Sequence, residues 1–545
     1  MAPIAEAEGG VETKRMPGYA RYTPEGGPVL AQGWRFERLT PPSRLYGANG
    51  VCAGPDGRIY VAQVSGSAIS AVDIDTGAVD TISPRGGPIV GPDDVVFDDD
   101  GNLYVTEITE GRVSVRPPNG ETRILRGDIA HANPITFHQG RLFAGELRAD
   151  GRIVELDRHG GEPRVLVASA MMPNAFQVGP DGMLYYPAMA ANEIWRVRLD
   201  GGAPERVVGD LGMPTSVKFD SAGRIVSTQM MTGQVLRIDP RNGRREALAD
   251  IGVGLDNLAF VGDRLFVTNV DGSIHEVQGG GALRSLVPAG FNWPLDVAMG
   301  DDDVLYVADG LAVFALEPGG APQAVGGFFT PGCPGYARGL AAPRPGELIV
   351  TTADGKVARW RPAARESEVL AEGFDELYGV AAAPGGAVVF AEAGRGRVLS
   401  VKAGEVEVLA SGLDRPTGVA VDDHGACFVT ETAAGRVVQL SGGRTETVLD
   451  GLKQPQGILL RDGRLYVVDA LAKELVEHDL ATRASCTIAA NLPVGAPLGA
   501  TAKSLGALGP RVGPQAPFAG LTAGADGSLY LAGDAEGAIL ALRLA

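Results

Sequence analysis

Short runs of alternating apolar and polar residues fill the chain, and turn residues separate them. Residues 49–63, NGVCAGPDGRIYVAQ, and residues 93–107, DDVVFDDDGNLYVTE, show the pattern clearly. In both, a period-2 run rich in Val, Ile, Leu, Phe and Tyr is broken at an Asp-Gly pair and then resumes. Two further runs follow each pair. This spacing predicts four short antiparallel strands joined by tight turns, which we label A to D in chain order.

The four-strand unit recurs twelve times, about every forty residues. Units of this length are typical of β-propeller blades, with strand A at the channel and strand D at the rim. One ring of twelve blades would enclose a channel too wide for side chains to fill. We therefore expect an all-β protein made of two tandem six-bladed propellers.

The D strands suggest how the rings close. The chain stops after its twelfth C strand at 538–542, whereas residues 34–40 and 282–288 are strand-like runs without an obvious partner. We expect each ring to begin with the strand that completes its own last blade. On this basis 34–40 pairs with 273–277, and 282–288 pairs with 538–542.

The same accounting divides the chain into three parts and an insertion. Residues 1–33 are expected to be a flexible leader, 34–280 the first propeller and 281–545 the second. The one irregular interval contains residues 491–518, rich in Gly, Ala and Pro. As a connection from strand D to strand A, it should lie like a lid over the mouth of the second channel.

Composition and charge narrow the possible partners. The net charge of −18 argues against nucleic acid or an anionic membrane as a partner, since both attract clustered Lys and Arg. No stretch of 18 apolar residues occurs, and the N-terminus has no apolar core of a signal peptide. The four cysteines are far apart and do not suggest a disulfide framework. A cytoplasmic protein with a small-molecule substrate is expected; the oligomeric state stays open, with a monomer the simplest choice.

Candidate metal ligands lie at the starts of the A strands in the first ring. The starts of A strands and the ends of B strands converge on one mouth, so their side chains should meet there. Five of the six first-ring positions are Asn or Asp, and the sixth is Thr215: Asn49, Asp93, Asn133, Asn174 and Asp256. Carboxylate and amide oxygens suit a hard divalent cation, Ca²⁺ above all, with Mg²⁺ or Zn²⁺ as alternatives. Asn and Asp also begin strands by bonding nearby backbone groups, which is the structural alternative.

Candidate catalytic residues surround the same mouth. A metal that polarises a carbonyl needs a neighbouring acid or base. Glu107 and Glu146 end adjacent B strands, Asp94 follows a proposed ligand, and His131 lies on the loop before Asn133. We expect Glu107 and Glu146 to lie close enough to share one substrate.

The second ring offers a rival site of different composition. Its A strands start with Leu, Arg, Tyr, Thr, Gln and Ala rather than Asn and Asp, but acids still end its B strands. The residues concerned are Asp309, Arg338, Tyr378, Glu392, Glu431 and Asp469. They could hold a cation or a cationic substrate group, or could simply form a solvated rim.

The recurring pattern P-x-N/D-G-x-A-x-D-x-x-G-x-x-Y-V-A-x resembles a known superfamily. It is similar to senescence marker protein (regucalcin), gluconolactonase and strictosidine-synthase-like six-bladed propellers, and to NHL repeats and virginiamycin B lyase. The lactonase resemblance implies a channel metal, with Asn133 and Asn174 at its asparagine positions and Asp256 or Asp93 at its aspartate position. Asn49 stands where that family has a glutamate.

The lyase resemblance rests on the tripeptide Val-Thr-Glu, which ends at Glu107 and again at Glu431. In that branch Glu and His near a magnesium ion serve an elimination. Together the resemblances imply a metal-dependent lactonase or lyase acting on a small oxygenated metabolite, in specialised metabolism for example. The alternative from a different class is a non-catalytic NHL-like propeller that binds or scaffolds a partner.

Overall fold

Each sequence repeat forms one antiparallel sheet in the computed structural model, which describes residues 21, 26–501, 503–508 and 512–545. Over these residues the chain forms twelve sheets, eleven of four strands and one of five. The fold is all-β and of the β-propeller type. The first twenty residues of the predicted leader lie outside the described part.

Six sheets, which we call the first ring, come from one continuous segment. Their strands, four to a sheet and given from the inner to the outer strand, are β3 (Val51–Ala53), β4 (Ile59–Gln63), β5 (Ala68–Val72), β6 (Val79–Ser83); β7 (Pro92–Phe97), β8 (Leu103–Glu107), β9 (Arg112–Arg116), β10 (Arg123–Arg126); β11 (Ala132–His138), β12 (Arg141–Glu146), β13 (Ile153–Leu156), β14 (Arg164–Val167); β15 (Gln177–Val178), β16 (Met183–Ala188), β17 (Glu193–Arg198), β18 (Glu205–Val208); β19 (Lys218–Phe219), β20 (Ile225–Thr228), β21 (Gln234–Ile238), β22 (Arg245–Asp250); and β23 (Leu255–Val261), β24 (Arg264–Asn269), β25 (Ile274–Val277), β26 (Leu283–Val287).

The other six sheets, the second ring, combine both ends of the chain. Their strands are β27 (Asp296–Met299), β28 (Leu305–Asp309), β29 (Ala312–Leu316), β30 (Gln323–Gly327); β31 (Ala337–Arg344), β32 (Glu347–Thr352), β33 (Lys356–Arg361), β34 (Glu366–Glu372); β35 (Leu377–Ala382), β36 (Val388–Glu392), β37 (Arg397–Lys402), β38 (Glu405–Ser411); β39 (Pro416–Val421), β40 (Cys427–Glu431), β41 (Arg436–Ser441), β42 (Arg444–Leu449); β43 (Pro455–Arg461), β44 (Arg464–Asp469), β45 (Glu474–Asp479), β46 (Ser485–Ala490), β1 (Val29–Leu30); and β47 (Leu521–Ala523), β48 (Leu529–Gly533), β49 (Ala538–Leu544), β2 (Trp34–Arg38). Four three-residue 3₁₀ turns complete the described elements: η1 (Met189–Ala191), η2 (Gly279–Gly281), η3 (Pro362–Ala364) and η4 (Pro384–Gly386).

Apolar side chains between neighbouring sheets close each ring. In the first ring, Val51 and Ile59 of the first sheet pack with Phe266 of the last sheet in one buried cluster. In the second ring, Leu305 of the first sheet packs with Ile539 of the last. Because each blade is covered on both faces, both sets of alternate residues in its central strands are buried between sheets, as in β4 and β8.

The predicted closing pairs are wrong. Strand β26 pairs with β25 of its own sheet, and β2 pairs with β49 at the other end of the chain, with Trp34 opposite Leu544. A local hairpin across the turn Gly279–Gly281 closes a short loop at low entropic cost, so the first ring completes its last blade from its own segment. The blade that the C-terminus leaves one strand short is completed by β2.

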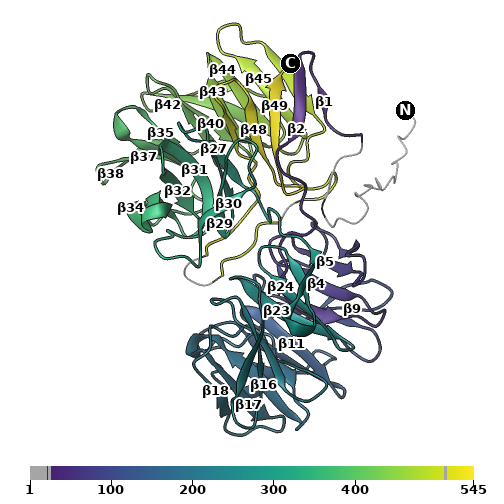
Figure 1. Cartoon of the computed structure of the whole chain (residues 1–545). Coiled ribbons are helices and arrows are strands. Elements are labelled where there is room, and N and C mark those ends of the chain that lie inside the picture. The colour runs from purple at the N-terminus through teal and green to yellow at the C-terminus, as the bar shows by residue number, and fades with distance from the viewer. Residues whose placement is uncertain (1–20, 22–25, 502, 509–511) are drawn as a thin grey trace, which may run out of the picture.

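The described chain therefore places β1 and β2 in the second ring, then builds the first ring and returns to the second. Figure 1 shows this as the purple strands β1 and β2 beside the yellow strand β49, apart from the first ring. The described end of the predicted leader is also paired, since Val29 and Leu30 lie opposite Ala490 and Ala489. Residues 34–38 thus pair within the second ring, although the predicted domain division assigned them to the first.

The described part of the insertion 491–518 packs against both rings. Phe518 packs against Tyr378 at the second mouth, with ring centroids 5.8 Å apart. Lys503 donates a hydrogen bond to the carbonyl of Gly87 in the first ring, over 3.3 Å. Leu505 of the insertion shares one buried apolar cluster with Val90 of the first ring and Tyr378 of the second. The insertion therefore joins the two rings.

In the described part of the chain, no helix has the length and apolar character needed to cross a membrane.

Candidate metal and active site

Six polar side chains begin the inner strands of the first ring, at the positions that the repeat pattern predicts. Asp93, Asn133 and Asp256 lie inside β7, β11 and β23, whereas Asn49 lies two residues before β3 and Asn174 three residues before β15. The pairing register shifts beside each of the first three residues, between Pro92 and Val95 in β7 for example. Such a bulge bends the strand and redirects successive side chains.

Asp93 and Asp256 form a buried pair of like charges. Both are less than a tenth exposed. Burial raises the pKa of each carboxyl group above its ordinary value, and neighbouring carboxylates raise it further: Asp256 and Asp94 act on Asp93, and Asp94 acts on Asp256. A hydrogen bond from Asn49 opposes the shift at Asp256. A cation between these groups would relieve both the burial and the repulsion.

Asn133 supplies an unsatisfied oxygen beside this pair. Its side chain is 2% exposed, and its Oδ1 accepts no hydrogen bond in the structure. Buried polar atoms are rarely left unpaired, so this oxygen is available to a ligand.

The remaining members of the set are partly committed to the protein. Asn174 Oδ1 accepts a hydrogen bond from the backbone of Ala175 at 2.7 Å, and Asn49 Oδ1 accepts one from Val64 at 3.2 Å. Thr215 donates its hydroxyl to the Leu255 carbonyl at 3.0 Å. The side-chain oxygens of Asn49 and Asn174 each keep one lone pair for a ligand. The hydroxyl of Thr215 is instead occupied by its bond to Leu255.

The donor set fits a hard cation better than a soft one. Within the described residues, no group of three or more His, Cys, Asp and Glu side chains is placed to hold a metal. A cation at this mouth would therefore combine the two carboxylates Asp93 and Asp256 with amide oxygens and water. Calcium accepts such mixed oxygen shells.

Asp94, a predicted catalytic residue, connects three blades. Its Oδ2 accepts the backbone N–H of Ile135 in the next blade at 3.2 Å, and its Oδ1 accepts from Val95 and from Asn257 Nδ2. Burial raises the pKa of Asp94 to about 6, and the positive charge of Lys218 opposes this rise.

Asp296 holds the same place in the second ring. It accepts hydrogen bonds from Val297 and Leu340, both at 2.9 Å. The repetition of these contacts in a ring without the Asn and Asp set favours a structural role for both Asp94 and Asp296.

Glu107 and Glu146 are likewise held inside their own blades. Glu107 is fully buried, accepts the backbone N–H of Val90 at 2.7 Å, and pairs with Arg112 at 2.5 Å. Glu146 pairs with Arg152 at 2.6 Å. Burial alone would raise the pKa of Glu146, but the hydrogen bonds from Arg152 outweigh it and leave that pKa lowered. These contacts favour a structural role over the shared catalytic role expected from the sequence.

His131 is the predicted catalytic residue that keeps a free side chain near the mouth. It lies directly before β11, partly exposed, with a left-handed backbone (φ 51°). Burial lowers its pKa, the charge of Arg148 lowers it further, and Glu146 opposes both. The imidazole is therefore neutral at pH 7 and able to accept a proton.

The acids of the rival site in the second ring bind the backbone. Asp309 accepts hydrogen bonds from the N–H groups of Asn292 and Trp293, at 2.9 and 2.6 Å. Backbone N–H groups are also bound by Glu392, Glu431 and Asp469.

Arg338 and Tyr378 of the rival site are both 1% exposed, and the guanidinium lies 4.4 Å from the centre of the tyrosine ring. Phe518 packs on Tyr378 and is itself buried.

Parts of the chain are similar to known proteins. Residues 34–270 match the family model described as SMP-30/Gluconolactonase/LRE-like region. The chain is also 29% identical over 175 residues to a gluconolactonase of Zymomonas mobilis, a match that covers 31% of this chain and 39% of that relative. The match thus spans about two fifths of the relative's length.

Three solved structures resemble parts of the chain. A streptogramin B lyase structure is 18% identical with a TM-score of 0.38, covering 50% of this chain and 94% of its own. The virginiamycin B lyase of Staphylococcus aureus is 16% identical with a TM-score of 0.38, covering 51% and 95%. A chain of a nidogen/laminin complex is 21% identical with a TM-score of 0.37, covering 40% and 88%.

A row of threonines that the sequence interpretation did not single out supports the site. Thr106 donates its hydroxyl to the carbonyl of Asn133 at 2.6 Å, Thr268 to that of Asn49 at 2.7 Å, and Thr228 to that of Asp256 at 3.3 Å. Each bond joins one blade to the chain at the start of the next inner strand. The repeated tripeptide Val-Thr-Glu was the sequence signal for these bonds. Its Thr donates a hydrogen bond to the neighbouring blade, and its Glu accepts one from the loop that precedes the inner strand.

Proposed function

We propose that this chain is a metal-dependent enzyme of the lactonase or lyase type that acts on a small oxygenated metabolite at the mouth of the first ring. We further infer that the two rings are tandem six-bladed propellers. The observation that carries the functional proposal is the buried pair Asp93 and Asp256 beside the unsatisfied Oδ1 of Asn133.

The residues that would hold the metal are Asp93, Asp256 and Asn133, with Asn49 and Asn174 contributing the free lone pairs of their amides. When bound, a divalent cation supplies Lewis acidity toward a carbonyl oxygen. Oxygen ligands and partial negative charge favour Ca²⁺, with Mg²⁺ or Zn²⁺ as alternatives. The family resemblance of residues 34–270 supports the same assignment.

His131 is the proposed proton-transfer residue. It is neutral, partly exposed and two residues before Asn133, so it can take a proton from water or from an acidic carbon of a substrate at the mouth. Glu146 and Arg148 lie near enough to His131 to influence its pKa. The backbone of His131 is fixed, because its carbonyl accepts the N–H of Leu147 at 3.0 Å.

Turnover before and after chelation tests this proposal. We expect the protein to hydrolyse or eliminate at least one member of a panel of small lactones and cyclic esters. Activity should be lost on chelation and return when Ca²⁺ is added. His131→Ala should lower turnover about 10² times, in the range of general acid–base contributions, and His159→Ala, on a remote turn, should not. No turnover of any panel member by metal-loaded protein would favour the non-catalytic binding or scaffold alternative.

A further inference from the structure

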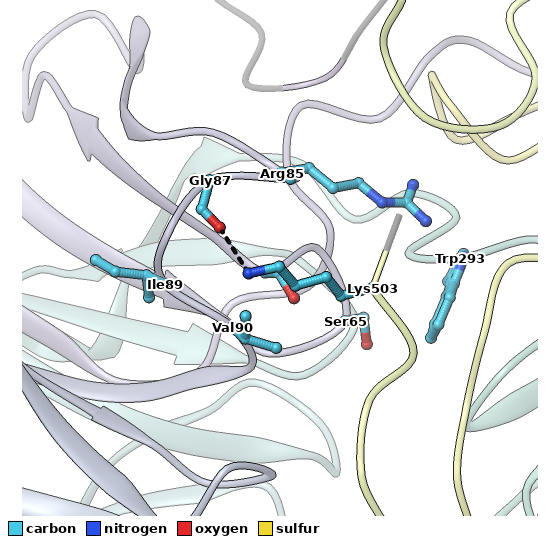
Figure 2. Close-up of a pocket in the computed structure, with 9 residues that line it drawn as sticks. Ser65, Arg85, Gly87, Ile89, Val90, Trp293 and Lys503 are labelled. Carbon is cyan, nitrogen blue, oxygen red and sulfur yellow. Dashed lines mark hydrogen bonds between the residues drawn. The ribbon is translucent and has the colours of Figure 1, made fainter. Parts of the chain in front are cut away.

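A small cavity lies where the first ring, the inter-ring connection and the insertion meet. Its volume is about 10 Å³. Ser67 and Arg85 come from the first ring, Trp293 from the connection between β26 and β27, and Lys503 from the insertion. Figure 2 shows Arg85 extending toward Trp293 and Lys503 bonded to the carbonyl of Gly87. A cavity of this size holds one water-sized occupant.

Two of the groups that line the cavity are buried donors without acceptors. Arg85 NH1 and Trp293 Nε1 form no hydrogen bond in the structure. The Arg85 side chain is 6% exposed and Trp293 is 1% exposed, so bulk water does not satisfy either group. Ser67 Oγ accepts the N–H of Gly91 at 3.1 Å, which leaves its O–H free to donate. An unsatisfied buried donor costs about 1 to 3 kcal/mol, and more when charged.

The charges around the cavity are predominantly positive. Arg85 and Lys503 both line it, and no carboxylate does. The carboxylate that faces Arg85 is Asp534, whose Oδ2 lies 4.0 Å from Arg85 NH1, too far for a hydrogen bond, and accepts none from any other group. Asp534 Oδ1 accepts the N–H of Gly495 at 2.6 Å. Asp534 also faces Arg21 and Lys473, each of which has a second carboxylate nearby, Asp309 and Asp469 respectively.

We propose that this cavity binds a monatomic anion, chloride, between Arg85 and Trp293. Such an ion would accept hydrogen bonds from the Arg85 guanidinium, the Trp293 indole N–H and the Ser67 hydroxyl at the same time. The volume leaves no room for phosphate, sulfate or a carboxylate. Because the donors come from the first ring and from the connection that leads to the second, the ion would fasten this connection to the first ring. The site is separate from the metal set and does not depend on the proposed activity.

Bromide and chloride provide the test. Crystals of the full chain soaked in sodium bromide should show an anomalous peak in the cavity. In solution, the melting temperature should rise saturably when chloride replaces gluconate at constant ionic strength, as expected for a ligand that binds only the folded state. Arg85→Met should abolish this dependence, and Arg123→Met, on an exposed strand, should retain it.

Trp293→Phe keeps an aromatic ring but removes the N–H, so it should weaken the chloride dependence at least tenfold in half-saturating concentration. This variant serves if Arg85→Met does not fold. An anomalous map without a peak in the cavity, or equal melting temperatures in chloride and gluconate, would show that the cavity holds only water and would overturn the proposal.

Discussion

Trp34 lies opposite Leu544 in the outer ladder of the second ring, so the two ends of the chain complete one sheet. The first ring is built entirely from residues between these two strands. All strands of the first ring therefore come from one segment between the termini, whereas the last sheet of the second ring reaches four strands only with β2.

Separated rings should differ in stability. A fragment of residues 41–288 contains all strands of the first ring and should melt cooperatively as a monomer. A fragment of residues 281–545 lacks β2, which exposes the edge of β49 and should cause aggregation. Adding a peptide of residues 28–40 should restore its solubility, measured by size-exclusion chromatography and thermal melting. A soluble, cooperatively melting 281–545 fragment without the peptide would refute this closure.

Glu107→Gln should destabilise the fold rather than disable a site. The substitution leaves Arg112 without its buried partner, and breaking a buried pair costs about 3 kcal/mol or more. Urea unfolding measures this loss, and the exposed neighbour Glu110→Gln should unfold like the wild type. Unchanged stability together with lost turnover would instead return Glu107 to the active site.

The threonine hydrogen bonds between blades should contribute to the stability of both rings, but only those in the first ring should affect metal affinity. Thr106→Val and Thr430→Val each remove a hydroxyl that donates to the next blade, at the carbonyls of Asn133 and Gln456. Each should cost about 1 to 3 kcal/mol, because buried backbone groups are left unpaired. Only Thr106→Val should also weaken Ca²⁺ binding, since it frees Asn133. Equal calcium affinities in the two variants would separate this threonine from the site.

The buried acid of the second ring should make stability depend on pH. Burial raises the pKa of Asp296 to about 7, above its unfolded value of about 3.9. The folded state therefore holds this proton more tightly, so its contribution is complete below about pH 4 and is lost as pH rises through about 7. Asp296→Asn should flatten the fall in unfolding free energy across this window, and the exposed Asp301→Asn should not. Parallel urea-unfolding curves for wild type and Asp296→Asn would contradict the assignment.

Much of the blade structure could be read from the sequence, because alternation and turn residues act locally. The inner-strand starts are where the repeat count places them, and the structure brings Asp256 close enough to Asp93 to raise the pKa of Asp93. Strand pairing at closure could not be read, because β2 and β49 carry no local mark of their partner across most of the chain.

The acids at the B-strand ends show a second limit. The sequence predicts where these acids lie along the strands. It does not predict where each carboxylate points, because that depends on which nearby backbone N–H groups lack an acceptor. The carboxylate of Glu107 reaches Val90, seventeen residues earlier, and Asp309 reaches Asn292 in the same way. These backbone N–H groups come within reach of the carboxylates only once the loops are folded. The insertion shows a third limit, because only the placement of two rings brings Lys503 to Gly87.

Calcium binding measured by titration calorimetry on metal-free protein tests the central claim most directly. The account predicts one ion per chain for the wild type, and at least a tenfold loss of affinity in Asp93→Asn and in Asp256→Asn, each of which removes formal charge from the set. Asp296→Asn, an equally buried acid of the second ring, should bind like the wild type. Equal affinity across all four proteins, or no binding of Ca²⁺, Mg²⁺ or Zn²⁺ by the wild type, would contradict a metal site at the first mouth.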